Sequence, residues 1–248
     1  MKKYFIITVV LFALSGYLYA QDIDKIVPDT VKEGNYETTY SHMKIAGRFE
    51  NFKKTGNWTI TFPSGQVHVL QEYKNGKKDG IRLQISKRGY IVDQKHFKAD
   101  SLDGEHIEFN FGGRVKLREF YVNGSLNGER TKYYERGKKQ EVSHYKNGVK
   151  DGVSKWYNSK GKLVAEYNYK DGMFDGEAKT YYSNDTLRSI QMYKLDVPVG
   201  EYREYFENGK PKIKGSYKNG KKEGKWYEYD EEGNVVSVKR YKRGELKK

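Results

Sequence analysis

Apolar and aromatic residues occur along this chain in short blocks of strand length, and each block ends at a turn signal. The block Trp58–Phe62 is rich in β-branched and aromatic residues, Pro63-Ser64-Gly65 then turns the chain, and residues 66–74 form a second block. Residues 75–80 turn the chain again. Two strands of about six to eight residues joined by glycine-containing turns are typical of a β-hairpin. No window shows a sustained 3.6-residue apolar period, so we expect no helix among these blocks.

This hairpin pattern recurs with a period of 24 residues, and three series of positions keep that period. The anchor glycines are Gly56, Gly80, Gly104, Gly128, Gly152, Gly176, Gly200 and Gly224. The loop glycines are Gly65, Gly89, Gly113, Gly137, Gly161, Gly209 and Gly233, with Asp185 in place of one. The aromatic series is Phe49, Tyr73, Phe97, Tyr121, Tyr145, Tyr169, Tyr193, Tyr217 and Tyr241. Self-similarity at a fixed period of this size indicates a repeat architecture.

The loop glycines predict a strand register. A three-residue hairpin loop, a type I turn followed by a left-handed residue, favours glycine at its third place. Loops at 63–65, 135–137, 159–161, 207–209 and 231–233 satisfy that preference, and aspartate at 185 tolerates the same conformation. This register sets Tyr157 opposite Leu163, Tyr181 opposite Leu187, Phe109 opposite Val115 and Tyr229 opposite Val235. Such aromatic–aliphatic cross-strand pairs each contribute about 0.2–1 kcal/mol.

Hairpins stacked side by side predict an all-β fold. We expect an elongated single-layer antiparallel meander of about eight 24-residue β-hairpin repeats, hence about sixteen strands. The 23 tyrosines and 26 glycines suit a thin, twisted sheet with many turns better than a globular core. We assign residues 47–244 to the repeat array, residues 21–46 to a linker and N-terminal cap, and residues 245–248 to a C-terminal tail.

Residues 1–20 have the pattern of a signal peptide. Lys2 and Lys3 precede an apolar run from Tyr4 to Leu14, and Ala20 provides a small residue for cleavage. A retained membrane anchor is the alternative, although the run is shorter than the roughly 20 residues that a spanning helix needs. We therefore expect an exported protein that is periplasmic, associated with the outer envelope, or secreted.

The turn sequences are similar to those of MORN repeats in their bacterial variant form. Tyr73-Lys74-Asn75-Gly76-Lys77-Lys78-Asp79-Gly80 and the segments beginning at Tyr121, Tyr145 and Tyr217 carry the resemblance, which extends over about residues 47–244. Asp100 and Asp196 depart from the glycine of the turn, and Ser86 and Asn110 lie in weakly aromatic units. The resemblance implies an elongated antiparallel sheet with a role in scaffolding, dimerisation or contact with proteins and lipids. Some bacterial relatives resemble antitoxin or immunity proteins.

The residues provide little for catalysis. No cysteine is present, which excludes disulfides, zinc–thiolate sites and thiol nucleophiles. The five histidines, His42, His68, His96, His106 and His144, form no His-x-x-x-His pair, and we expect them on the surface or on strand faces. The acidic residues before anchor glycines, Asp79, Asp103, Asp151, Asp175 and Glu223, occur once per repeat and are interpreted as turn formers. We expect no enzyme activity, no cofactor and no metal.

Two surfaces are candidates for binding. One is a lysine-rich turn edge, with its candidate residues Lys74, Lys77, Lys78, Lys146, Lys150, Lys218, Lys221 and Lys222. It could hold an anionic envelope polymer or acidic lipid, or it could be a solvated edge, because acidic residues are interspersed. The other is a tyrosine stripe at 24-residue spacing, Tyr133, Tyr157, Tyr181, Tyr205 and Tyr229, with Trp156 and Trp226 expected on the opposite face.

The formal net charge of +14 is compatible with an anionic partner but also with simple solubility. Our leading hypothesis is a non-enzymatic protein-binding or scaffolding module, and an immunity or antitoxin-like role is a special case of it. The alternative is electrostatic binding of an anionic polymer or lipid through the lysine-rich turn edge. We expect no nucleic acid as partner, because export separates the chain from the cytoplasm.

Overall fold

The computed structural model describes residues 22–29 and 33–247, so the predicted signal peptide lies outside the described residues. The chain divides into two compact units: unit 1 comprises Met1–Val115 and Tyr121–Gly124, and unit 2 comprises Lys116–Phe120 and Ser125–Lys248. Unit 1 contains α2 (Ile23–Ile26), β1 (Gly34–Tyr40), β2 (Met43–Glu50), β3 (Lys53–Thr61), β4 (Val67–Lys74), β5 (Lys77–Ile85), β6 (Ile91–Lys98) and β7 (Ser101–Phe109). Strand β8 (Val115–Val122) has residues in both units.

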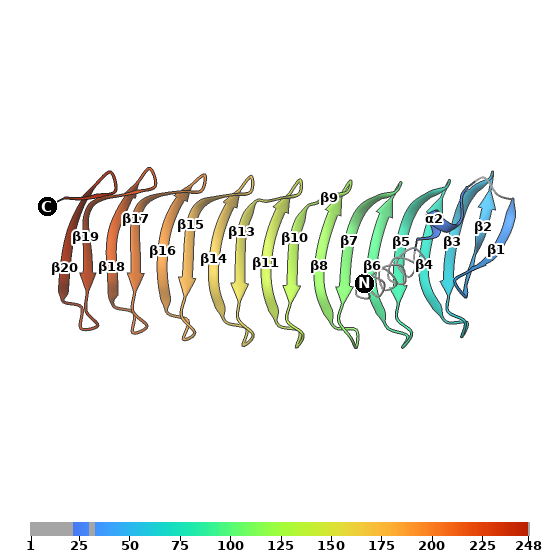
Figure 1. Ribbon diagram of the computed structural model, residues 1–248, viewed down its shortest axis with the longest axis horizontal. Coiled ribbons are helices and arrows are strands. Elements are labelled where there is room, and N and C mark those ends of the chain that lie inside the picture. The colour runs from blue at the N-terminus through green and yellow to red at the C-terminus, as the bar shows by residue number, and fades with distance from the viewer. Residues whose placement is uncertain (1–21, 30–32, 248) are drawn as a thin grey trace, which may run out of the picture. The chain divides into compact units, whose positions relative to one another are not determined.

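Unit 2 consists of strands and turns throughout its described part. Its strands are β9 (Ser125–Leu126), β10 (Gly128–Tyr133), β11 (Lys139–Lys146), β12 (Val149–Lys150), β13 (Gly152–Tyr157), β14 (Leu163–Lys170), β15 (Met173–Tyr181), β16 (Leu187–Lys194), β17 (Val197–Tyr205), β18 (Pro211–Lys218), β19 (Lys221–Tyr229), β20 (Val235–Lys242) and β21 (Glu245–Lys247). Within each unit, successive strands lie side by side (Figure 1) and pair antiparallel, except that β9 and β10, and likewise β12 and β13, are consecutive pieces of one strand, so that β13 pairs with β11.

The predicted fold class is confirmed: the structure is all-β, with antiparallel hairpins that repeat every 24 residues. Residues 22–29 and 33–247 contain 21 strands rather than about sixteen. Strands β1 and β2 begin before the array and β21 follows it, while Asn127 and Asp151, each just before an anchor glycine, separate β9 from β10 and β12 from β13. We number the repeats from one to eight by their anchor glycines, so repeat six is residues 176–199. No helix lies within residues 47–244, as predicted.

The three-residue loops are present in the predicted register. Gly65 has a φ of 86° and donates its N–H to the Phe62 carbonyl, which closes the type I turn. Asp185 takes the same left-handed conformation, with a φ of 70°. Tyr157 pairs with Leu163, Tyr181 with Leu187 and Tyr229 with Val235, as the register required.

The other turn is shorter than predicted. Only Asn75 and Gly76 form it, because both have a left-handed φ, 52° and 81°, and a two-residue turn of this kind matches the twist of the flanking strands. The strand β5 already begins at Lys77, and the anchor glycine Gly80 lies inside it with a φ of 110°. The pairing of β4 with β5 shifts register at this point, so the anchor glycine forms a bulge rather than a turn.

The two-residue turns are linked from one repeat to the next. The second residue of each turn donates its N–H to a carbonyl 22 residues earlier, as Gly76 does to Lys54 and Gly172 to Lys150. Carboxylates add to this link by accepting the N–H of the first turn residue in the following repeat, as Asp103 does from Asn123 at 3.0 Å and Glu223 from Arg243 at 2.7 Å. Four of the five predicted turn formers therefore join neighbouring repeats instead of closing their own turn, whereas Asp175 forms an ion pair with Lys194.

Two departures from the repeat pattern have a structural reason. Asp100 and Asp196 occupy the glycine place of the turn with φ values of 72° and 66°. Their carboxylates accept backbone N–H groups of the preceding repeat, from Lys78 at 2.8 Å and from Phe174 at 2.7 Å. Aspartate adopts the left-handed φ less easily than glycine does, and at these two turns its carboxylate provides an additional hydrogen bond to the preceding repeat.

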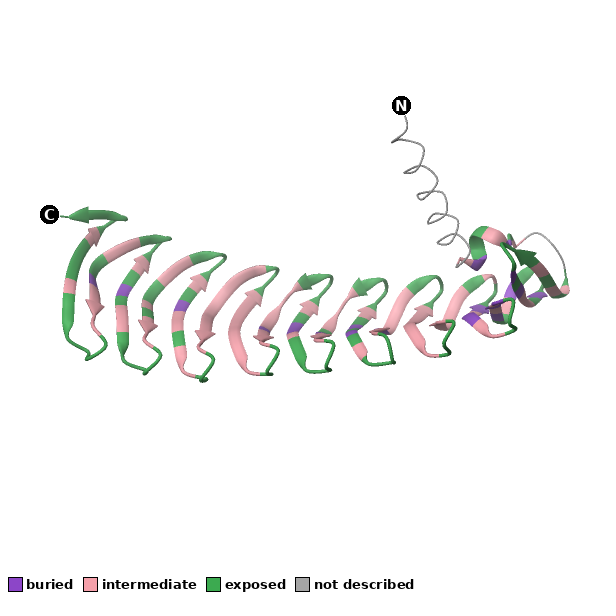
Figure 2. Ribbon diagram, turned by 60° about the horizontal axis from the view of Figure 1, so that its bottom comes forward, coloured by how far each residue is buried: buried purple, intermediate pink, exposed green. Residues whose placement is uncertain are grey.

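The enclosed core lies in unit 1. Phe49, Trp58 and Ile60 are each 0% exposed there, together with Ile23 and Val27 from the segment around α2. Figure 2 shows the buried residues gathered around α2 and strands β2–β4. Among the described residues of unit 2, only Leu117, Val142 and Trp226 are buried apolar side chains. Unit 2 therefore leaves most of its aromatic surface partly exposed.

The segments outside the array also have regular structure. Part of the predicted linker and cap, residues 22–29 and 33–46, forms α2, β1 and the beginning of β2. Residues 245–247 of the predicted tail form β21, which pairs with β20. The domain boundaries themselves stay a prediction.

Candidate protein-binding face

We call the sheet face that carries Trp58 in unit 1, and Trp156 and Trp226 in unit 2, the aromatic face. Alternation along each strand places every second residue on it. Trp58 contacts Phe49 with ring centroids 5.0 Å apart, and Trp226 contacts Tyr217 at 5.1 Å. Each of these indoles lies directly over a glycine, Gly47 or Gly215, where an added Cβ would come within 2.1 or 2.2 Å of the ring. The glycines therefore make room for the two tryptophans.

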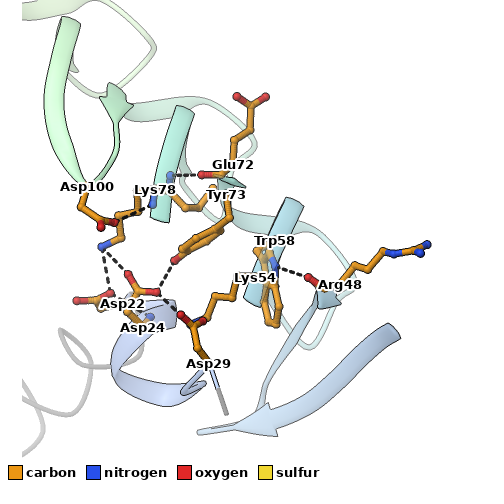
Figure 3. Close-up of polar contacts among 11 residues, drawn as sticks. Asp22, Asp24, Asp29, Arg48, Lys54, Trp58, Glu72, Tyr73, Lys78 and Asp100 are labelled. Atoms are coloured by element: carbon orange, nitrogen blue, oxygen red, sulfur yellow. Dashed lines mark hydrogen bonds and ion pairs between the residues drawn. The ribbon is translucent and has the colours of Figure 1, made fainter. Parts of the chain in front are cut away.

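In unit 1 the chain covers the aromatic face with its own residues 22–29. The Tyr73 hydroxyl donates to Asp24 at 2.9 Å, and the Lys78 ammonium lies 3.0 Å from the other oxygen of that carboxylate. Lys54, which is almost fully buried, pairs with Asp29 at 2.8 Å. These contacts converge from α2, β3, β4 and β5 (Figure 3). Ile23 and Val27, at 2% and 0% exposure, provide the apolar part of the same docking.

The charges of this docked segment are strongly coupled to its surroundings. Burial of Asp24 opposes its ionisation, but the hydrogen bond and charge of Lys78, with Tyr73 and Lys54, outweigh burial and hold the pKa of Asp24 below its usual 3.8. Burial and the adjacent Asp24 carboxylate raise the pKa of Tyr73 far above its ordinary value, so its hydroxyl stays a donor. The docking is therefore built on a carboxylate that is ionised at neutral pH.

In unit 2 the same face has no covering segment among the described residues. Its rings form two clusters. In the first, Phe174 contacts Tyr169 at 4.8 Å and Tyr193 at 5.5 Å. In the second, Tyr202 stacks on Trp226 at 5.7 Å. All of these side chains except Trp226 are partly exposed.

A hollow of about 280 Å³ separates the two clusters. Its floor consists of Ala178, Thr180, Ser189 and Gln191, and its walls are rings. The residues that line it are Tyr167, Phe174, Ala178, Thr180, Ser189, Gln191, Tyr193, Pro198, Tyr202 and Tyr217. The floor residues are cross-strand neighbours, because Ala178 pairs with Gln191 and Thr180 with Ser189.

The hollow exists because repeat six has small side chains at two places of this face, at least one of which holds a large side chain in every other repeat. Ala178 takes the place that Trp58 and Trp226 have two residues after their anchor glycines, and Thr180 takes the place of Trp156. Sequence reasoning missed these residues because it searched for conspicuous side chains. An alignment of the eight repeats against one another would have shown the two small residues.

Comparison with known families identifies the repeats. The MORN repeat variant family matches residues 126–147, 150–171, 174–195, 198–219 and 222–243, which are five consecutive units of the same length. Five of the repeats, between residues 126 and 243, are MORN variant repeats. The hollow lies within the second, third and fourth of these matched MORN repeats.

Other comparisons add little to this identification. No curated protein matches the chain. Among solved structures, one match is the "Crystal structure of accessory secretory protein 1,2 and 3 in Streptococcus pneumoniae", at 12% identity and a TM-score of 0.16. It covers 66% of this chain and 24% of that chain, so the MORN repeat chain spans about a quarter of that protein's length.

The MORN turns place the predicted lysines in two groups. Lys74, Lys77, Lys146, Lys218 and Lys221 are exposed at the two-residue turns. The other three lie against rings of the aromatic face. Lys78 is near Phe97, Lys150 lies 4.7 Å from the Trp156 ring, and Lys222 lies 4.1 Å from the Trp226 ring. The structure therefore does not bring all eight together.

The predicted tyrosine stripe lies at the other end of the MORN hairpins. Each of its residues is the last of its strand before a three-residue loop, and Tyr133, Tyr157, Tyr181, Tyr205 and Tyr229 are all half-buried. Tyr229 stacks on Tyr227, with ring centroids 6.4 Å apart. Tyr227 directly follows Trp226 in β19, so the two tyrosines lie on the sheet face opposite to Trp226. The aromatic face thus belongs to different tyrosines from the ones we predicted.

The histidines serve the MORN framework. His96 and His144 each have Nδ1 within 3.0 Å of a backbone carbonyl beside an anchor glycine, Glu105 and Val153. His68 is buried, and burial lowers its pKa despite a hydrogen bond to the Ile85 carbonyl. The described residues hold no group of His, Asp and Glu side chains fit to bind a metal ion. Within residues 22–29 and 33–247, no helix has both the length and the apolar character that a membrane-spanning helix requires.

Proposed function

We propose that this MORN repeat chain is a non-enzymatic, exported module that binds another protein through the aromatic face of unit 2. One observation carries the proposal. The aromatic face of unit 1 already holds a peptide segment, residues 22–29, whereas the same face of unit 2 has none among the described residues. An immunity or scaffolding role would each use this same surface.

The exposed rings of unit 2 favour a protein partner physically. Tyrosine and tryptophan combine a large apolar area with a polar edge, which makes them common anchors of interfaces. Tyr193, Tyr202 and Tyr217 lie on the neighbouring strands β16, β17 and β18, and Tyr169 lies two strands before β16; all four rings are partly exposed. Burial raises the pKa of each of these tyrosines, so the hydroxyls remain neutral donors over the physiological range.

The test is a pull-down from envelope extract with residues 21–248 as bait, washed at low and high salt. Two variants in β17 provide a matched pair, because Tyr202 lies on the aromatic face and Tyr205 belongs to the predicted stripe. We expect wild type and Tyr205→Ala to retain the same protein through high salt, and Tyr202→Ala to lose about tenfold or more, as for an interface hot spot. Retention by Tyr202→Ala with loss by Tyr205→Ala would assign binding to the predicted stripe instead. Thermal melting of both variants checks that they fold.

The electrostatic alternative rests on the turn edge. The residue before the two-residue turn is an exposed lysine at five consecutive repeats of unit 2: Lys146, Lys170, Lys194, Lys218 and Lys242. Of these five lysines, only Lys194 has a carboxylate of a described residue within ion-pair distance, Asp175 at 3.2 Å. Lys218 also faces Lys221 directly across the strands, and like charges so placed cost stability. Loss of all bound material at high salt, with only polymer or lipid held at low salt, would favour this edge.

A further inference from the structure

The repeats of this chain show which side chain the hollow of repeat six would accept. Two residues after the anchor glycine, repeats one and eight carry Trp58 and Trp226, and repeat six carries Ala178. Trp58 lies among Tyr36, Phe49 and Tyr73, and Trp226 among Tyr202, Tyr217 and Tyr241, with ring centroids 5.0–6.2 Å apart. The chain therefore surrounds an indole with rings at this position of the repeat whenever it supplies one.

The surroundings of Ala178 match those of Trp226 only in part: Tyr193 keeps the place of Tyr241, but Ser154 takes that of Tyr202 and Tyr167 that of Gly215. Tyr193 corresponds to Tyr73 and Tyr241 of the other two repeats, and it lines the hollow with Phe174 and Tyr202. Thr180 and Ser189 satisfy each other through a 2.6 Å hydrogen bond, whereas the buried Oε1 of Gln191 has no hydrogen-bond partner among the described residues and is free to accept an N–H such as that of an indole. Tyr167, which pairs with Ala178, closes one side. The result is a ring-walled space of about 280 Å³ over small side chains.

The hollow is unsuited to a cation. In repeats with a lysine two places before the anchor glycine, its ammonium lies against the rings, as Lys150 does with Tyr169 at 5.1 Å and Lys222 with Tyr241 at 5.2 Å. In the two repeats around the hollow, Phe174 and Pro198 take that place. No carboxylate is among the described residues that line it. A leucine would leave part of the space empty, and unfilled cavity volume costs binding energy.

We infer that the hollow is the receptor for one tryptophan side chain presented by the partner protein. The indole would enter the hollow from outside and lie against Phe174, Tyr193 and Tyr202, which are rings of its lining, as Trp226 lies against rings within the chain. This inference rests on the proposed function and specifies the anchor residue of its partner. Offset and edge-to-face ring contacts favour an aromatic occupant beyond what area burial alone provides.

The first test uses a small indole probe, N-acetyl-L-tryptophanamide, with protein labelled at the alanine methyl carbons. Ala178 is part of the floor, so its methyl signal reports occupancy directly. We expect this signal to shift on titration with the indole probe and to shift at least several-fold less with N-acetyl-L-leucinamide or N-acetyl-L-lysinamide. An unmoved Ala178 signal, or equal shifts with the leucine probe, would overturn the inference.

The second test fills the hollow from within. Ala178→Trp and Thr180→Trp copy the tryptophan positions of the other repeats, and Val238→Trp adds the same bulk at an exposed residue outside the hollow. We expect both filled variants to lose the indole probe, and the control to keep it. Two filled positions are used because Tyr167 could obstruct one of them. Probe binding by both folded filled variants would refute the site.

The two proposals fail in different ways. If Tyr202→Ala loses the captured protein while both filled variants retain it, the aromatic face binds but the tryptophan anchor is wrong. If Tyr202→Ala and the filled variants all retain it, the proposed face itself is wrong.

Discussion

At the scale of single residues, the acidic side chains before the anchor glycines link one repeat to the next. Asp103 illustrates it, since its carboxylate accepts the backbone N–H of Asn123, 20 residues further along the chain. The residue pair thus connects a strand of one repeat with the turn of the next. Because the same link recurs at Asp79, Asp151 and Glu223, adjacent repeats are joined at the turns as well as through strand pairing.

This link predicts the effect of Asp103→Ala. The substitution removes the acceptor and leaves the Asn123 amide to water, so we expect the free energy of unfolding to fall by about 0.5–1.5 kcal/mol. Urea denaturation measures the change. Asp103→Asn keeps an acceptor oxygen and should lose clearly less. Equal losses in the two variants would mean that the charge at this position matters, and the hydrogen bond does not.

At the scale of elements, α2 with its flanking residues is held by ionised carboxylates, and this makes its docking sensitive to pH. The folded pKa of Asp24 lies below its usual 3.8, so its contribution is complete above that value and is lost as the pH falls through the folded pKa. Asp24 is partly exposed, with 36% of its side chain accessible, and solvent screening limits its contribution to about 1 kcal/mol.

The measurement compares wild type with Asp24→Asn by urea unfolding at pH 7 and near pH 3. We expect wild type to be more stable by about 1 kcal/mol at pH 7, and the difference to shrink toward zero at the lower pH. The comparison between variants cancels the titration of other groups. A difference that is constant with pH would show that Asp24 acts through packing alone.

The elements also show how far the sequence determines the structure. The three-residue loops follow from local chemistry, because glycine at position 65 and its equivalents is the residue that a left-handed loop position favours, and this prediction is confirmed. The predicted six-residue turn was wrong for a related reason. Asn75 and Gly76 suffice to turn the chain, and Gly80 has a positive φ because of a bulge, which a sequence series alone does not distinguish from a turn.

The candidate site was less predictable than the fold. The stripe at Tyr157 was found by its period, but periodicity does not tell which set of tyrosines gathers around tryptophans. The docking of residues 22–29 depends on Lys54 and Tyr73, contacts between segments that are distant in sequence. The hollow depends on the small size of Ala178, and a missing side chain gives no positive signal.

At the scale of the whole chain, the strict period makes each repeat exchangeable in principle. Hydrogen bonds of the turns join residues 20 or 22 apart, and strand pairing joins nearest neighbours. Stability in such an array is approximately a sum over repeats and their interfaces. Removing one complete period should therefore preserve every remaining type of contact.

This reasoning predicts the result of deleting residues 176–199, which is repeat six. The deletion joins Asp175 to Gly200, another anchor glycine, so the fused strand continues β15 as β17 and keeps its register. We expect an unchanged strand signature in far-UV circular dichroism and a cooperative unfolding transition. The indole probe should no longer bind, because the floor of the hollow is gone. Deleting 177–199 instead leaves one residue too many, and a one-residue slip exchanges the two faces of a strand. The shorter deletion should therefore be far less stable, whereas equal stability of the two would mean that the period does not determine the pairing.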